Sequence, residues 1–132
     1  IKMRTLIKGI IILVWFLSLT ITAQEKVWLD KDLRITNPSN ASYYKIVTTK
    51  EVSYYYKNGN FFRKQNYSEG KLEGKFSEFY NTGELKIIGK HENGLREGVW
   101  KTFYKNGKIK TKGKYRNGEK VGIWKTFYKN VY

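Results

Sequence analysis

The side chains that could perform acid–base, nucleophilic or metal chemistry are few in this sequence and do not gather into a set. The 132 residues include one His and no Cys, which excludes disulfides, thiolate nucleophiles and thiolate metal sites. His91 is followed by Glu92, but neighbours in a strand point to opposite faces. No second His and no repeated Asp or Ser completes a catalytic set. We therefore predict a protein that is not an enzyme and holds no cofactor or metal.

Two carboxylates recur in equivalent sequence surroundings. Glu73 and Glu97 each stand directly before a glycine, but Val121 takes the third such position. Because the series stops there, a pair of metal ligands is the weaker interpretation. We expect loop carboxylates that are solvated or paired with a neighbouring Lys, as is usual for Glu.

Positive charge is the strongest chemical signal. The sequence has 26 Lys and Arg against 11 Asp and Glu, a formal net charge of +15, which favours anionic partners. Lysines alternate with other residues near the C-terminus and have one phenylalanine among them. The candidate binding residues are Lys101, Phe103, Lys105, Lys108, Lys110, Lys112, Lys114, Lys125 and Lys129. The competing interpretation is a soluble outer face, since Lys also blunts sheet edges.

An internal repeat with a period of about 24 residues predicts the elements that must position these lysines. The block 100–106 returns unaltered as 124–130. We predict copies at 50–73, 74–97 and 98–121 and a truncated copy at 122–132, after a cap or degenerate repeat at 24–49. The repeated signature residues are Phe76, Tyr80, Gly83, Gly89, Gly98, Trp100, Tyr104, Gly107, Gly113, Gly118, Gly122, Trp124 and Tyr128.

Each copy is predicted to be a β-hairpin. Asn106-Gly107, flanked by alternating sequence, predicts a two-residue type I′ turn. That turn would oppose Tyr104 to Ile109 and Trp100 to Gly113, so that a ring covers a bare glycine within each hairpin. Alternation then places Trp100 and Ile109 on a buried face and the candidate lysines on a wet face. The predicted fold is all-β, one elongated, twisted antiparallel sheet of tandem hairpins.

The segment 1–23 has the features of an export signal. Three cations within 1–8 precede the apolar run 9–19, and the segment 20–23 ends on the small residue Ala23, which suits cleavage there. The apolar run is short for a membrane span, and charged sequence follows it. We predict a cleaved signal peptide at 1–23 and a periplasmic, outer-surface or secreted protein; an uncleaved N-terminal membrane anchor is the alternative.

The pattern Gly-x-Trp-x-x-Phe-Tyr-x-Asn-Gly-x-Ile, followed by Gly-x-Tyr-x-Asn-Gly-x-x-x-Gly, resembles the MORN repeat in its bacterial variant form. Residues 50–132 carry the resemblance, and 24–49 match weakly. The signature positions of the third copy are Gly98, Trp100, Phe103, Tyr104, Gly107, Gly113, Tyr115, Gly118 and Gly122. The resemblance implies an array of β-hairpins that acts as a protein-interaction or lipid-associated module. Some bacterial members carry an antitoxin label.

Three functions are consistent with these features. The first is non-catalytic binding to a protein partner, and the second is binding to anionic membrane or an envelope polymer such as polysaccharide. The third, implied by the resemblance alone, is neutralisation of a cognate toxin. Nucleic acid is a poor candidate for an exported protein, although aromatic residues among lysines suit single strands.

The fourth copy departs from the pattern. Val131 stands where Gly107 stands in the third copy, and the sequence stops at Tyr132. The segment 122–128 is therefore predicted to be an open edge strand that could pair with a second copy of the chain. The favoured interpretation is that the chain is a fragment of a longer array, and pairing of this edge with a second copy or another partner is the alternative.

Overall fold

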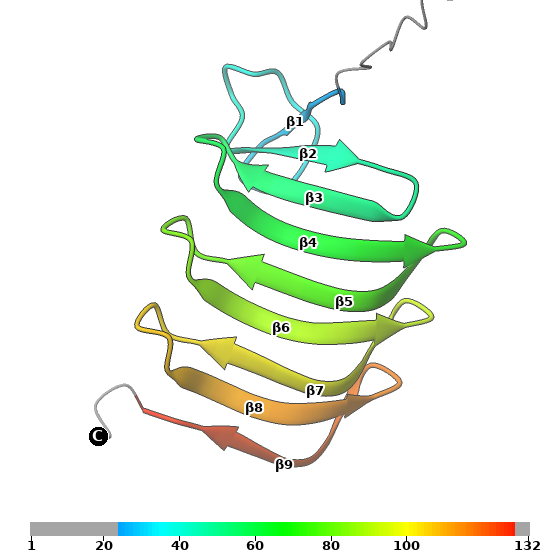
Figure 1. Ribbon diagram of the computed structural model, residues 1–132, viewed down its shortest axis with the longest axis vertical. Helices are drawn as coiled ribbons and strands as arrows, with labels where there is room; N and C mark the ends of the chain where they lie inside the picture. The colour runs from blue at the N-terminus through cyan, green and yellow to red at the C-terminus, as the bar shows by residue number, and fades with distance from the viewer. Residues whose placement is uncertain (1–23, 129–132) are drawn as a thin grey trace, which may run out of the picture.

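The computed structural model describes residues 24–128, which form one antiparallel sheet in which each strand lies beside the one before it in sequence (Figure 1). The predicted signal peptide 1–23 and residues 129–132 lie outside the described residues. The nine strands are β1 Val27–Leu29, β2 Tyr43–Val47, β3 Glu51–Tyr56, β4 Phe61–Ser68, β5 Lys71–Phe79, β6 Leu85–Glu92, β7 Leu95–Phe103, β8 Ile109–Arg116 and β9 Glu119–Thr126. Within this range there is no helix long and apolar enough to cross a membrane.

The all-β array of hairpins predicted from the sequence is confirmed. The strands stack along the long axis of the molecule, and the connections between them lie alternately at one end of the strands and at the other (Figure 1). Residues 24–49, predicted to be a cap or degenerate repeat, contribute β1 and β2 to the same sheet. Strand β9 pairs with β8 and with no other strand among residues 24–128. Self-association through the segment 122–128 stays a prediction.

The sheet has two chemically different faces. We call one the aromatic face because a row of rings runs along it, with neighbouring ring centroids 5.1–5.9 Å apart. This row consists of Phe76, His91, Trp100, Tyr115 and Trp124. The other is the lysine face, which carries Lys75, Lys90, Lys101, Lys112, Lys114 and Lys125. A single-layer sheet has no second layer to cover it, so the rings must bury one another.

The turn at Asn106-Gly107 differs from the prediction. The Gly107 N–H donates to the Tyr104 carbonyl and the Tyr104 N–H to the Lys108 carbonyl, both at 2.9 Å, which closes a loop of three residues. Gly107 has a φ of 84°, whereas Asn106 is not among the residues with positive φ. This is a type I turn followed by a left-handed glycine. The predicted pairing of Tyr104 with Ile109 is therefore wrong, because Phe103 opposes Ile109.

Two-residue type I′ turns occur at the opposite ends of the strands. Asn93 and Gly94 have φ values of 50° and 82°, and Asn117 and Gly118 have 49° and 81°. The strand pairs that flank them leave two residues in each loop, and two successive positive φ values define type I′. The same Asn-Gly dipeptide therefore forms both turn types. The number of residues between the paired strand ends decides which one forms.

Two substitutions separate the turn types. Asn117 is left-handed, so we expect Asn117→Gly to leave the free energy of unfolding within about 0.5 kcal/mol of the wild type. The Asn106 Oδ1 accepts a hydrogen bond from the Lys108 N–H at 3.0 Å. Asn106→Gly removes that bond and adds backbone freedom to the unfolded chain, so we expect a loss of about 1 kcal/mol. Urea unfolding measures both, and equal effects would show that the turns are wrongly assigned.

The rings that cover strand glycines come from the next hairpin, which corrects the prediction that they act within one hairpin. Trp100 does pair with Gly113 in the strand register. The ring against Gly113, however, belongs to Trp124, whose Cδ2 would lie 2.1 Å from a Cβ added there, and the Trp100 ring covers Gly89 in the same way. A bulge in β7, where Gly98 has a φ of 69°, lets the Trp100 ring reach β6. These contacts join successive repeats.

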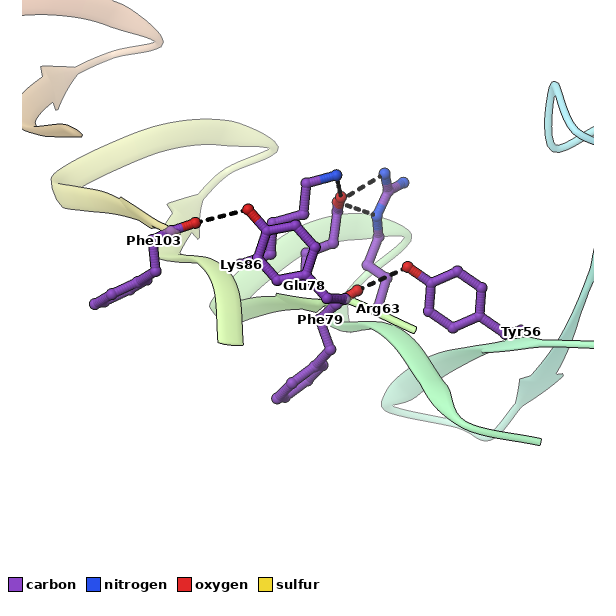
Figure 2. A network of polar contacts seen from close by, with 7 residues as sticks. Tyr56, Arg63, Glu78, Phe79, Lys86 and Phe103 are labelled. Atoms are coloured by element: carbon purple, nitrogen blue, oxygen red, sulfur yellow. Dashed lines mark hydrogen bonds and ion pairs between the residues drawn. The ribbon is translucent and has the colours of Figure 1, made fainter. Parts of the chain in front are cut away.

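Tyrosine hydroxyls also join one repeat to the next. The Tyr56 hydroxyl donates to the Phe79 carbonyl at 2.9 Å (Figure 2), and the Tyr80 hydroxyl donates to the Phe103 carbonyl at 2.8 Å. Tyr104 repeats the contact one unit further along. Each bond satisfies a carbonyl near the end of a strand, where the ladder stops. The regular return of this tyrosine in the sequence therefore has a structural cause.

The recurring carboxylates hold turns in place. The Glu73 Oε2 accepts from the Asn93 N–H at 2.8 Å, and the Glu97 Oε2 accepts from the Asn117 N–H at 2.9 Å. Glu73 and Glu97 lie within β5 and β7, and neither forms an ion pair with a lysine among residues 24–128, so the prediction of lysine-paired loop carboxylates is wrong. A carboxylate makes a strong acceptor for a backbone N–H, and here it anchors the type I′ turn of the following hairpin.

Candidate binding face

Three lysines on neighbouring strands oppose one another directly on the lysine face. Lys101 of β7 pairs with Lys112 of β8, and Lys112 pairs with Lys125 of β9. Strands lie about 4.8 Å apart, so the three Cα atoms span about 10 Å. Within residues 24–128, none of the three forms an ion pair. Like charges directly opposed across an antiparallel pair are destabilising, so the free protein carries uncompensated repulsion here.

Two similar hollows adjoin this row of lysines. The first measures about 390 Å³ and the second about 480 Å³, and Val99 contributes to both. Each combines three lysines with aliphatic side chains. The first is lined by Lys75, Lys90, Lys101, Ile88 and Val99, and the second by Lys112, Lys114, Lys125, Val99, Val121 and Ile123. Val99 is 41% exposed and Ile123 is 84% exposed, so apolar surface remains open to solvent among the charges.

The structure brings together only part of the predicted basic set. The residues that share the lysine face are Lys101, Phe103, Lys112, Lys114 and Lys125. Ile109, predicted on the buried face, opposes Phe103 and so lies on the lysine face. Lys108 is exposed in a turn, and Lys129 lies outside the described residues.

Two predicted lysines lie on the aromatic side instead. The ammonium of Lys105 lies 5.6 Å from the centroid of the Tyr80 ring, and that of Lys110 lies 5.7 Å from the Tyr104 ring. Lys110 is the additional residue between two register positions of β8, and a bulge interrupts alternation. Sequence alternation alone therefore misplaces it.

Two lysines of the face were not among the predicted set. Lys75 and Lys90 oppose each other across β5 and β6 and line the first hollow. They stand one repeat before Val99 and Lys114. Applying the period to Lys114 would have found Lys90. Lys75 has no such signal because its counterpart is aliphatic.

The geometry agrees with a known repeat family. Residues 72–93 and residues 96–117 each match the family model described as MORN repeat variant. These two segments are MORN repeats of the variant form. The two matches begin one repeat apart and cover the hairpins β5–β6 and β7–β8. MORN repeats are generally non-enzymatic and commonly act as binding modules. A search of curated proteins found no match.

Basic side chains of the MORN array cover its own aromatic face. The guanidinium of Arg96 lies 4.4 Å from the centroid of the Trp100 ring, and the ammonium of Lys120 lies 4.6 Å from that of Trp124. These are cation–π distances, and the aliphatic stems of such residues bury apolar surface as well. The aromatic face is therefore occupied by the chain's own side chains.

One buried carboxylate lies on the aromatic face of the MORN array and is neutralised by two cations (Figure 2). Glu78 is 6% exposed. Its Oε2 lies 3.0 Å from the Nη2 of Arg63, and its Oε1 lies 3.6 Å from the Nζ of Lys86. Arg63 belongs to β4, Glu78 to β5 and Lys86 to β6, so this carboxylate joins three neighbouring strands.

His91 is part of the ring row. It is 8% exposed and packs edge-on against Phe76 and Trp100, with centroid distances of 5.5 and 5.2 Å. Burial, and secondly the Arg96 guanidinium, hold the pKa of His91 below its usual value of 6.5. Residues 24–128 contain no cluster of three or more His, Cys, Asp or Glu that could hold a metal ion. The histidine replaces a strand aromatic, since Tyr115 takes its place one repeat later.

The buried histidine makes stability depend on pH. Because its pKa is lowered in the folded state, the unfolded chain binds the proton more readily, and the stability present above pH 6.5 is lost as the pH falls toward the folded-state pKa. His91→Tyr is expected to remove this part of the pH dependence. Urea unfolding between pH 7.5 and 5 measures it, and an unchanged slope in the variant would contradict the assignment to His91.

Proposed function

We propose that this MORN array is a non-catalytic module that binds a protein partner on its lysine face. The observation that carries the proposal is the exposed aliphatic surface of Val99 and Ile123 among the lysines. Protein interfaces commonly combine an apolar centre with a polar, charged rim. The opposite face is covered by the array's own side chains, including Arg96.

The array is suited to present that face without rearrangement. Trp100 and Trp124 pack on glycines of the preceding hairpin, and tyrosine hydroxyls bond to the following one. Each unit is thereby fixed against its neighbours. A rigid surface loses little conformational entropy on binding, which favours docking by a preformed platform.

Affinity purification from the native source tests the proposal. We expect one stoichiometric protein partner, retained at moderate salt by the wild type and lost by the variant K101Q/K112Q/K125Q. The matched control is K57Q/K71Q/K108Q, which removes the same charge at exposed positions that lie outside the opposed row and line neither hollow. Retention of the partner by the face variant would overturn the proposal. If the partner is lethal when expressed alone and harmless with this chain, the binding neutralises a toxin.

A second candidate function, attraction to anionic membrane or envelope polymer, is favoured by the formal net charge of +15. Such attraction weakens as salt screens it and depends on total charge more than on one site. We therefore expect both triple variants to lose retention on anionic liposomes or envelope polymer equally. Loss by the lysine-face variant alone would show a specific site instead.

We also propose that residues 1–23 direct export by way of a cleaved signal peptide. The support is the order of cations, apolar run and small residues in the sequence. Mass spectrometry of the protein from the native source should find Gln24 as the first residue. Full-length protein in the membrane fraction would instead favour an N-terminal anchor.

A further inference from the structure

We infer that the partner contributes an extended acidic segment with an aliphatic residue at every third position, lying across β6–β9. Its aliphatic side chains would enter the two hollows, and its carboxylates would meet the row formed by Lys101, Lys112 and Lys125. The inference rests on the proposed function, that the lysine face docks a protein, and adds the chemistry of what is docked.

The charge argument starts from the row itself. Lys101, Lys112 and Lys125 are directly opposed on adjacent strands, and no carboxylate of residues 24–128 pairs with them. Elsewhere the described chain does pair its lysines, as with Lys64 and Glu51 at 3.4 Å. Local rules of sheet design tend to be broken where function requires it. Carboxylates placed along the row would relieve the repulsion.

The aliphatic side chains favour a polypeptide over other polyanions. Val99 and Ile123 are exposed within hollows that lysines surround. Nucleic acid backbones and acidic polysaccharides carry little apolar surface to fill them. A bilayer is a poor fit too, because Val and Ile are shorter than Lys and cannot reach past the ammonium groups into hydrocarbon. A peptide can direct an aliphatic side chain inward and keep carboxylates at the rim.

The spacing of the hollows sets the spacing of the segment. Val99 and Ile123 are equivalent positions one repeat apart, on strands separated by two strand spacings, or about 9.6 Å. A polyproline II segment returns to the same side every three residues after about 9.3 Å. A β-strand returns after about 6.7 Å and would miss the second hollow. An extended segment with apolar residues at positions i and i+3 therefore fits both.

Three labelled peptides test the inference by fluorescence anisotropy with the full chain. The probe is four repeats of Glu-Ile-Glu; one control replaces Ile with Ser, and the other replaces Glu with Gln. We expect each control to bind at least about tenfold more weakly than the probe. K101Q/K112Q/K125Q should weaken the probe by about tenfold or more, and K57Q/K71Q/K108Q by less than about twofold. Ile123→Ser should weaken the probe and leave the Ser control unchanged.

A stability measurement excludes misfolding as the cause of lost binding. Lys112→Glu places a carboxylate between Lys101 and Lys125, so the free protein should melt about 2–5 °C higher than wild type. The same variant should lose the probe. Lost binding with a raised melting temperature supports the inference, and an unchanged or lowered melting temperature contradicts the uncompensated row.

Other outcomes would overturn the inference in distinct ways. Equal binding of the probe and the Ser control, or displacement of the probe by heparin fragments, would identify a general polyanion site. Stronger binding to phosphatidylglycerol vesicles than to the probe would identify a membrane surface. If no peptide binds but native capture still requires the lysine face, the inference fails and the proposed function survives. If native capture does not require the lysine face, both the inference and the proposed function are overturned.

Discussion

Gly89→Ala is expected to lower the free energy of unfolding by about 3 kcal/mol, because the added methyl group would overlap the indole ring of Trp100. A Cβ at position 89 would lie 2.1 Å from Cδ2 and 2.2 Å from Cε2 of that ring. The ring cannot move aside at little cost, since Trp100 is 3% exposed and lies between His91 and the guanidinium of Arg96. Urea unfolding monitored by tryptophan fluorescence measures the loss.

Two controls identify ring overlap as the cause. Gly83 has no neighbour within 4 Å of an added Cβ but has a φ of 99°, so Gly83→Ala should cost only about 1–2 kcal/mol through backbone strain. In the double variant with Trp100→Ala the overlap disappears. Its loss should therefore be well below the sum of the single losses, and strict additivity would contradict the contact.

Trp100→Ala should be the most damaging single change, with a loss of about 4 kcal/mol in the free energy of unfolding. Trp100 packs on Gly89 and contacts the rings of Phe76, His91 and Tyr115, so its removal leaves a cavity where two repeats meet. Because each repeat is stabilised mainly by its neighbours, proteolysis should become faster at the β6–β7 connection.

Trp124→Ala is the matched comparison for this loss. Trp124 occupies the equivalent position one repeat later, where it contacts the ring of Tyr115 and the ammonium of Lys120. We expect it to cost clearly less than Trp100→Ala. Equal losses would contradict the conclusion that Trp100 owes its importance to contacts on both sides.

Much of the fold could be predicted because the same residue types return at equivalent positions of each repeat. Glycines and aromatic residues returning at the same positions of each copy predict hairpins of equal size, and the pairing of Trp100 with Gly113 follows from counting outward from the Asn106-Gly107 turn. Alternation also separates an aromatic from a lysine-rich face. Lys101 and Lys112 could be assigned correctly to the lysine face because they pair directly beside Trp100 and Gly113, with no bulge between the two pairs. Lys125 was assigned correctly as well, since it opposes Lys112.

The candidate site was less predictable, for a physical reason. Bulges add a residue to one strand and reverse alternation beyond it. Lys110 is such a residue, so it lies by the Tyr104 ring instead of on the lysine face. The turn at Gly107 likewise contains one residue more than the two-residue turn that the sequence predicted. Both depend on how neighbouring strands fit, which no local pattern encodes.

The sequence by itself determined the period, the strand content, the aromatic–glycine pairing and the positive charge of this protein. Only the tertiary structure decided that each tryptophan covers a glycine of the preceding hairpin, that Glu73 and Glu97 anchor turns, and that Lys75 and Lys90 join the candidate site. A period shows which residues are equivalent. Which residues touch depends on register and bulges between strands, and these are set by packing across the whole sheet.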